Sequence, residues 1–127
     1  SVMILNGMGG QRYTEQHAMN SARLMNEAQP DYLATLVVSF PMGLQRVQAG
    51  FNGEYQALEQ MGLFREIQMM LEALELEKTI FRSDHASNYL ILKGVLNKDK
   101  EKLLQTVNQA ISQPGSVRLR PESQRGL

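Results

Sequence analysis

A nearly continuous run of apolar and β-branched residues extends from Leu33 to Phe40. A strand with one face in water alternates apolar and polar side chains, whereas a strand covered on both faces is apolar almost throughout. The run therefore predicts a strand that is buried on both faces, as in the parallel sheets of α/β proteins.

The segments around this run predict further strands and helices. An apolar stretch from Ser1 to Leu5 ends just before Gly7, which is typical of a strand that leads into a tight turn. Thr79–Phe81 predicts a third short strand, and Tyr89–Leu92 another short extended piece. Three helices are expected, over 14–28 with Thr14 as its N-cap, over 59–76, and after Asn97, which caps the last one.

Each expected helix has one apolar stripe, which becomes its core face. The predicted core residues are Ala18, Ala22 and Met25 in the first helix, Leu63, Phe64, Ile67, Met70, Leu71 and Leu74 in the second, and Leu103, Leu104, Val107, Ala110 and Ile111 in the third. In the second helix the polar residues Glu66, Gln68, Glu72 and Glu75 are expected on the solvent side.

The predicted order is β-α-β-α-β-α, which favours mainly parallel strands joined by right-handed crossovers. The fold class is α/β, either an open sheet or a sector of a partial (β/α) barrel. We expect residues 1–127 to form one unit, a fragment of a longer domain, with the tail 115–127 extended or irregular. Three helices cover one face of such a sheet, so we expect the other face to need a partner, either the missing remainder of a barrel or a second copy in a homo-oligomer.

Charge and cysteine content exclude several classes of function. The 127 residues include 13 basic and 13 acidic side chains, so no overall field draws the chain to nucleic acid or an anionic membrane. Because cysteine is absent, the chain alone forms no disulfide, thiolate zinc site or iron–sulfur cluster. No apolar run approaches the ~20 residues of a bilayer span. We expect a cytoplasmic protein.

The glycine turn from Gly7 to Gly10 is the first candidate site. Bare backbone amides next to a helix start bind phosphate or carboxylate, or let a ligand lie against the main chain. The turn matches neither a Walker loop nor the dinucleotide-binding spacing. The alternative is a tight turn in which glycine serves only the backbone conformation.

The polar segment from Arg82 to Tyr89 is the second candidate, because α/β folds place their sites beyond the carboxyl ends of strands. His85 offers an acid, base or orienting group, and Arg82 offers a bidentate partner for a substrate carboxylate. The alternative is a polar loop that satisfies its own backbone. His17 is expected to be a surface or half-buried helix residue, and no metal site is predicted.

Several segments together resemble the C-terminal part of the catalytic domain of radical S-adenosylmethionine enzymes, in the bacterial group of Fe–S oxidoreductase-like proteins. These segments are 3–10, 15–18, 26–32 and 81–89, and the most specific is Phe-Arg-Ser-Asp-His-Ala-Ser-Asn-Tyr at 81–89. The resemblance implies a partial (β/α) barrel. It also implies that S-adenosylmethionine and a 4Fe–4S cluster belong to the parent enzyme, and that the three cysteines which hold the cluster lie in the missing N-terminal barrel half. Without cysteine, this fragment is expected to be inactive alone and to bind neither group.

The resemblance also implies roles for individual residues. The residues expected near the adenosine of the cofactor are Gly7, Met8, Gly9, Gly10, Val38, Ser39 and Phe40. The residues expected on the substrate side are Arg82, Ser83, His85, Ser87 and Asn88. The candidates for a catalytic role are Arg82, Asp84 and His85.

Two other functions stay open. One is a self-contained α/β module that holds a small anion at Gly7–Gly10 without catalysis. The other is a cofactor-free lyase or isomerase that uses His85 and Asp84, and it predicts turnover that is lost in His85→Ala.

Overall fold

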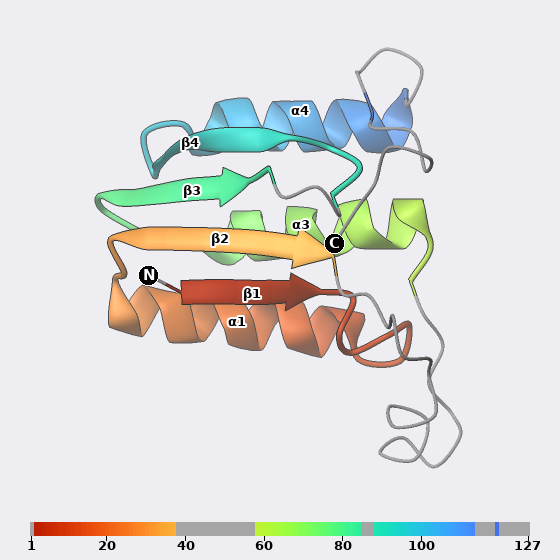
Figure 1. The fold of residues 1–127 in the computed structure, drawn as a ribbon, viewed down its shortest axis with the longest axis horizontal. Helices are drawn as coiled ribbons and strands as arrows, with labels where there is room; N and C mark the ends of the chain where they lie inside the picture. Colours follow the sequence, from red (N-terminus) through yellow and green to blue (C-terminus); the bar gives the residue numbers. More distant parts are fainter. Residues whose placement is uncertain (1, 38–57, 85–87, 114–118, 120–127) are drawn as a thin grey trace.

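The computed structural model describes residues 2–37, 58–84, 88–113 and 119, and within them one sheet and one layer of helices (Figure 1). The strands are β1 (Val2–Asn6), β2 (Tyr32–Val37), β3 (Thr79–Ser83) and β4 (Leu92–Leu96). The helices are α1 (Thr14–Ala28), α3 (Gln60–Ala73) and α4 (Lys100–Ser112).

The sheet is open and mixed, with the strand order β1-β2-β3-β4. β1 pairs with β2 and β2 with β3 in parallel, which confirms the α/β class. The predicted order β-α-β-α-β-α is wrong at β4, an additional strand that runs antiparallel to β3. The connection 84–91 is shorter than the dozen or more residues that a parallel crossover requires, so the chain returns antiparallel. The predicted extended piece Tyr89–Leu92 overlaps this strand only at Leu92.

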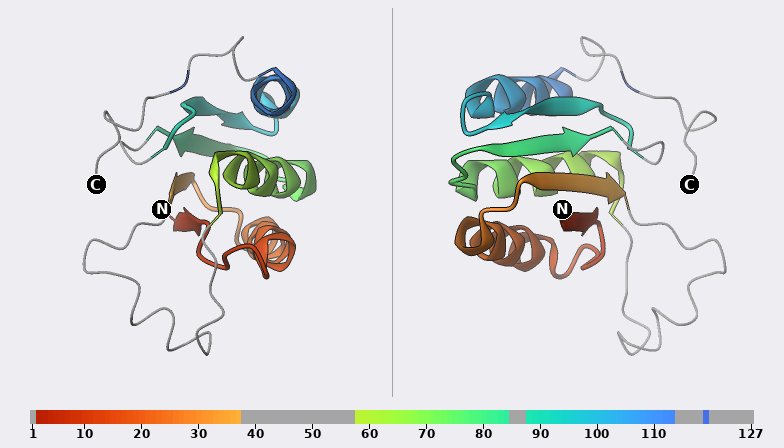
Figure 2. Two further views of the ribbon diagram at one scale, coloured as in Figure 1. Left: turned by 90° about the vertical axis from the view of Figure 1, so that its right-hand side faces the viewer. Right: turned by 60° about the vertical axis from the view of Figure 1, so that its left-hand side comes forward.

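The helices α1, α3 and α4 all lie on one face of the sheet (Figure 2). Their apolar stripes pack on the inward side chains of the strands, and the core faces expected from the sequence are confirmed. Leu33 of β2 and Phe81 of β3 are fully buried at the centre of this layer.

The other face of the sheet, here called the open face, carries side chains that the described part of the chain leaves accessible. Met3 and Tyr32 are 63% and 49% exposed, while their neighbours Ile4 and Leu33 on the helix side are buried. β2 alternates between buried and half-buried residues. Helices cover one face of this strand, as expected from their number, and on the other face Ala34 and Leu36 are half-buried, so coverage of both faces is confirmed for the helix side only (Figure 2).

Helix starts differ from the predicted caps. Tyr13, not Thr14, precedes the first helical residue of α1, and Asp99, not Asn97, precedes α4. The Asp99 carboxylate instead accepts a 2.9 Å hydrogen bond from the Val95 amide, and the Asn97 side chain accepts one from the Leu76 amide. Both side chains bind backbone amides outside the helix, and residue preferences at helix ends do not predict such contacts.

The end of α3 is held by side chains from other elements. Asn26 donates to the carbonyl of Ala73 and accepts from the amide of Glu75. The Lys100 ammonium donates to the carbonyls of Glu72 and Leu74 at 2.9 and 2.8 Å. Carbonyls at a helix end lack partners within the helix, so these contacts fix α3 against α1 and α4 without a glycine cap.

The prediction for the tail 115–127 concerns residues outside the described ranges, apart from Leu119. Within the ranges described, none of the helices combines the length and hydropathy that crossing a bilayer demands.

Candidate functional site

The parallel strands bring both candidate segments to one end of the sheet. The glycine turn follows β1, and Ser83 and Asp84 end or follow β3, so both segments lie at the rim formed by the carboxyl ends of β1, β2 and β3 (Figure 1). This is the rim at which α/β proteins place ligands. His85, Ser87, Val38, Ser39 and Phe40 lie outside the described residues.

The glycine turn is tight and internally bonded. Gly7 and Gly10 have positive φ angles of 87° and 64°, which glycine adopts without strain. The Gly10 amide donates to the Gly7 carbonyl at 3.0 Å, and the Met8 amide donates to the Leu5 carbonyl at 3.4 Å. A side chain at Gly9 would approach the Tyr13 backbone to about 3.1 Å, so this glycine permits close packing against the start of α1. The turn therefore needs its glycines for conformation and packing.

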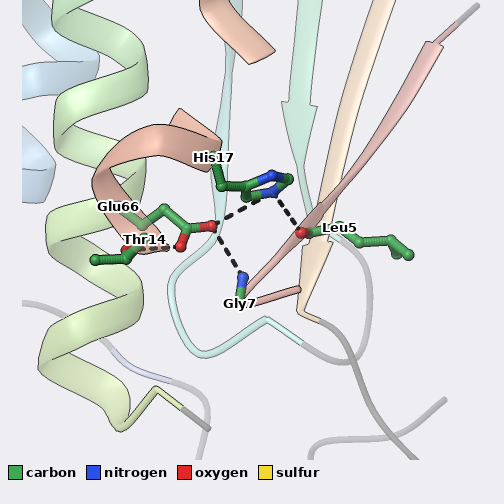
Figure 3. A network of polar contacts seen from close by, with 5 residues as sticks. All are labelled: Leu5, Gly7, Thr14, His17 and Glu66. Carbon is green, nitrogen blue, oxygen red and sulfur yellow. Dashed lines mark hydrogen bonds and ion pairs between the residues drawn. The ribbon is translucent and has the colours of Figure 1, made fainter. Parts of the chain in front are cut away.

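Glu66 of α3 joins this turn to the helix layer (Figure 3). Its carboxylate accepts hydrogen bonds from the Gly7 amide at 2.9 Å and from the Thr14 hydroxyl at 2.7 Å. The side chain is 1% exposed, so the prediction that Glu66 faces solvent is wrong. A buried carboxylate requires such donors, because an unpaired one is strongly disfavoured. Glu66 is thus a positioning residue for the glycine turn.

His17 of α1 completes this network. Its Nε2 lies 2.9 Å from the Leu5 carbonyl oxygen and 3.7 Å from Oε1 of Glu66 (Figure 3). A carbonyl only accepts, so Nε2 carries the hydrogen in this arrangement. The side chain is 25% exposed, which confirms the predicted half-buried position. The contacts with β1 and Glu66 were missed by the sequence reasoning.

The sequence does contain a signal for Glu66. It lies three residues after Leu63 and four before Met70, both on the apolar stripe of the helix. Positions three and four apart share a helix face, so Glu66 falls on the buried stripe. A charged residue at such a position indicates a buried hydrogen-bonded group, although the partners become known only from the tertiary structure.

Ser83 and Asn88 lie in a buried polar cluster with Thr35. The Thr35 hydroxyl donates to Oγ of Ser83 at 2.7 Å, and the Asn88 amide donates to the Thr35 carbonyl at 3.0 Å and to Oγ of Ser83 at 3.2 Å. Ser83 shares the helix-facing side of β3 with Phe81 and is fully buried. The cluster connects β2, β3 and the segment before β4, and the substrate-side role of Ser83 and Asn88 stays a prediction.

Arg82 and Asp84 lie near Lys93 of β4. Arg82 and Lys93 are directly paired across the two strands and are 52% and 58% exposed in their side chains. Oδ2 of Asp84 lies 3.7 Å from Nη1 of Arg82 and 3.7 Å from Nζ of Lys93. Sequence reasoning identified Arg82 and Asp84 as candidates but missed Lys93, because its proximity depends on the strand pairing.

Within the described ranges, no three histidine, aspartate or glutamate side chains come together to hold a metal ion. Comparison with protein-family models, with curated proteins and with solved structures gives no match, so the chemistry of the site is inferred from its geometry and from the sequence resemblance.

Proposed function

We propose that this chain is the C-terminal sector of a partial (β/α) barrel in a radical S-adenosylmethionine enzyme of the Fe–S oxidoreductase-like group. In this proposal the open face is the barrel interior. The rim at the carboxyl ends of β1–β3 contributes surfaces on the cofactor-adenosine side and on the substrate side. The chain alone is inactive, because it has no cysteine with which to hold a cluster.

The observation that carries the proposal is the arrangement of the sheet. Three parallel strands have all the described helices on one face and an exposed, largely apolar surface on the other. Parallel sheets are normally covered on both faces, and closure into a barrel achieves this by turning one face inward. The charged pair Arg82 and Lys93 at the rim of the same face fits a ligand side rather than a packing surface.

The turn after β1 fits contact with an adenosine group through its surface. Leu5 and Met8, 37% and 39% exposed, present apolar side chains at the end of β1. Such a surface suits the planar face of a purine. When bound beside a reduced cluster, S-adenosylmethionine supplies the hydrogen-abstracting chemistry of these enzymes. The cluster itself does not fit this chain, which carries no thiolate ligand.

The small-anion module is less well supported. Anion binding by a glycine turn needs several free backbone amides that converge on the ligand. The amides of Gly7, Met8 and Gly10 donate to Glu66, Leu5 and Gly7 respectively.

The proposal is tested in the complete reading frame. We expect it to encode a Cys-x-x-x-Cys-x-x-Cys motif upstream of Ser1. In the whole reconstituted protein, Met8→Glu is expected to weaken S-adenosylmethionine binding about tenfold in equilibrium dialysis, because a carboxylate replaces an apolar contact. Met19→Glu is the matched control, since Met19 is an exposed methionine on α1 in the helix layer, and it is expected to leave binding unchanged.

Three results would contradict the proposal. The first is a translation start at Ser1 without the cysteine motif. The second is stoichiometric 4Fe–4S uptake by the isolated chain during anaerobic reconstitution, which would refute the assignment of the cluster to the missing half. Equal effects of Met8→Glu and Met19→Glu would overturn the cofactor role of the turn.

The isolated chain is expected to cover its open face with a second copy. Exposed apolar side chains, and an edge of β1 with which no described strand pairs, favour association. Multi-angle light scattering should therefore detect a dimer or larger oligomer, and Met3→Lys should shift it toward the monomer. A clean wild-type monomer at high concentration would contradict this expectation. Replacement of Leu24, an exposed leucine on α1, by lysine is the control.

A further inference from the structure

The side chains of the open face are arranged in rows across the strands. One row contains Tyr32, Ile80 and Val95, which are paired in register and are all apolar or aromatic. The next row runs from Met3 through Ala34 to Arg82 and Lys93. Ala34 places only a methyl group beside Arg82, so the guanidinium borders a small side chain in an otherwise apolar surface. The charges of this face are thus concentrated on β3 and β4 at the rim.

The pairing of Arg82 with Lys93 is unfavourable in the chain alone. Like charges directly opposite one another on antiparallel strands destabilise the pair. Neither residue packs into the core, since both side chains are more than half exposed. Packing in the core therefore does not offset the repulsion between these two cations, and the nearby groups that can offset it are acidic.

Asp84 neutralises only part of this charge. One carboxylate faces two cations, which leaves a local charge of +1 from these three groups. Its 3.7 Å separations from both are ion-pair distances beyond hydrogen-bond length. In the part of the chain that the structure describes, no hydrogen bond engages the guanidinium of Arg82 or the ammonium of Lys93. Their donors remain available, and Arg and Lys are the residues that bind carboxylate and phosphate.

We propose that Arg82 and Lys93, with Asp84 between them, form a subsite on the open face for the anionic group of a small ligand, a carboxylate or a phosphate. The apolar row of Tyr32, Ile80 and Val95 borders the subsite on the side away from the rim and suits an apolar part of the same ligand. Lys93 contributes the second charge, and Asp84 orients both cations and lowers the affinity for the anion. The inference rests on the proposed function in one respect, that the open face is the ligand side of the sheet.

The test is a titration of the ¹⁵N-labelled full chain with acetate and, separately, with inorganic phosphate, at a dilution at which light scattering shows the monomer. Ionic strength is held constant with chloride, because exposed charges are sensitive to screening. We expect saturable shifts of the backbone amides of Arg82 and Lys93. Tighter binding of acetate identifies a carboxylate site, and tighter binding of phosphate identifies a phosphate site.

Variants that remove a positive or a negative charge test whether the anion binds at these residues. Lys93→Met should lower the affinity for the anion about tenfold, which corresponds to the loss of one charge-assisted hydrogen bond. Asp84→Asn should raise this affinity about threefold, because it removes the carboxylate that competes with the anion. Lys93→Arg should retain binding, and Lys78→Met, at an exposed lysine before β3, should leave it unchanged. The amide spectrum of each variant verifies that it is folded.

The proposal is overturned if neither anion gives saturable shifts at Arg82 and Lys93, or if Lys93→Met and Lys78→Met behave alike. The experiments distinguish failure of the subsite proposal from failure of the proposed function. Anion binding without an upstream cysteine motif would contradict the proposed radical enzyme and support the subsite. If the cysteine motif is present but neither the isolated chain nor the whole protein binds an anion, only the subsite proposal is contradicted.

Discussion

Replacing Glu66 by alanine is expected to lower the free energy of unfolding by about 2–5 kcal/mol. The variant removes the acceptor of the Gly7 amide and of the Thr14 hydroxyl. A donor left unsatisfied in a buried site costs about 1–3 kcal/mol, which applies to the Gly7 amide, and the partly buried Thr14 hydroxyl adds less. The lost side-chain volume adds to this value, because Glu66 is nearly as buried as the leucines around it. Urea denaturation followed by circular dichroism measures the change.

Two further variants separate the network from general effects on α3. Glu72→Ala removes an exposed carboxylate from the same helix and is expected to change stability by less than about 0.5 kcal/mol. Glu66→Gln keeps a carbonyl oxygen for one donor and should fall between the two. It should also accelerate hydrogen exchange at the Gly7 amide, which a loss of helix propensity alone would not do. Equal stabilities of Glu66→Ala and Glu72→Ala would contradict the role given to Glu66.

Phe81→Ala is expected to cost about 3–5 kcal/mol, the usual range for a large aromatic side chain removed from a packed core. Phe81 is 0% exposed and faces the helix layer at the centre of the sheet. Ile80 is adjacent on the same strand but faces the open side and is only partly buried. Ile80→Ala should therefore cost clearly less in the same denaturation experiment.

The comparison also reports whether the open face has a partner. If a second copy or the rest of a barrel covers this face, the cost of Ile80→Ala should increase when that partner is bound, while the cost of Phe81→Ala stays constant. Equal losses for the two variants in a monomeric chain would show that both faces of β3 are core. That result would contradict the assignment of an open face.

Much of the fold could be predicted from the sequence, because apolar periodicity alone specifies which side of each helix is buried. The stripe through Leu63, Ile67 and Met70 and the strand beginning at Thr79 are examples. β4 was predicted in part only, because Lys93 and Gly94 interrupt the apolar pattern that identifies a strand. The predicted N-cap at Thr14 was wrong because a contact from a distant part of the sequence was not visible in the local pattern. The hydroxyl of Thr14 donates to Glu66.

The sequence identified the segments of the candidate site, but it did not predict which of their side chains lie together. A strand followed by glycines, and a strand followed by polar residues, indicate the rim of an α/β sheet. Lys93 could not be connected with Arg82 before the antiparallel pairing was known, and the burial of Ser83 depends on which side of β3 faces the helices. Which groups meet is decided by register and by strand direction, and neither is a local property of the chain.

The reversed direction of β4 determines where the site can be extended. A strand added parallel to β4, beyond it, would end at the opposite side of the sheet from the glycine turn. At this edge a strand reaches the turn's rim with its carboxyl end only by pairing antiparallel to β4, whereas at the β1 edge it does so by continuing the parallel pairing. With a right-handed crossover, its helix would lie next to α1 in the existing layer. In the described sheet, parallel continuation of the strands that end at this rim is thus possible only beside β1, on the side of Leu5 and Met8.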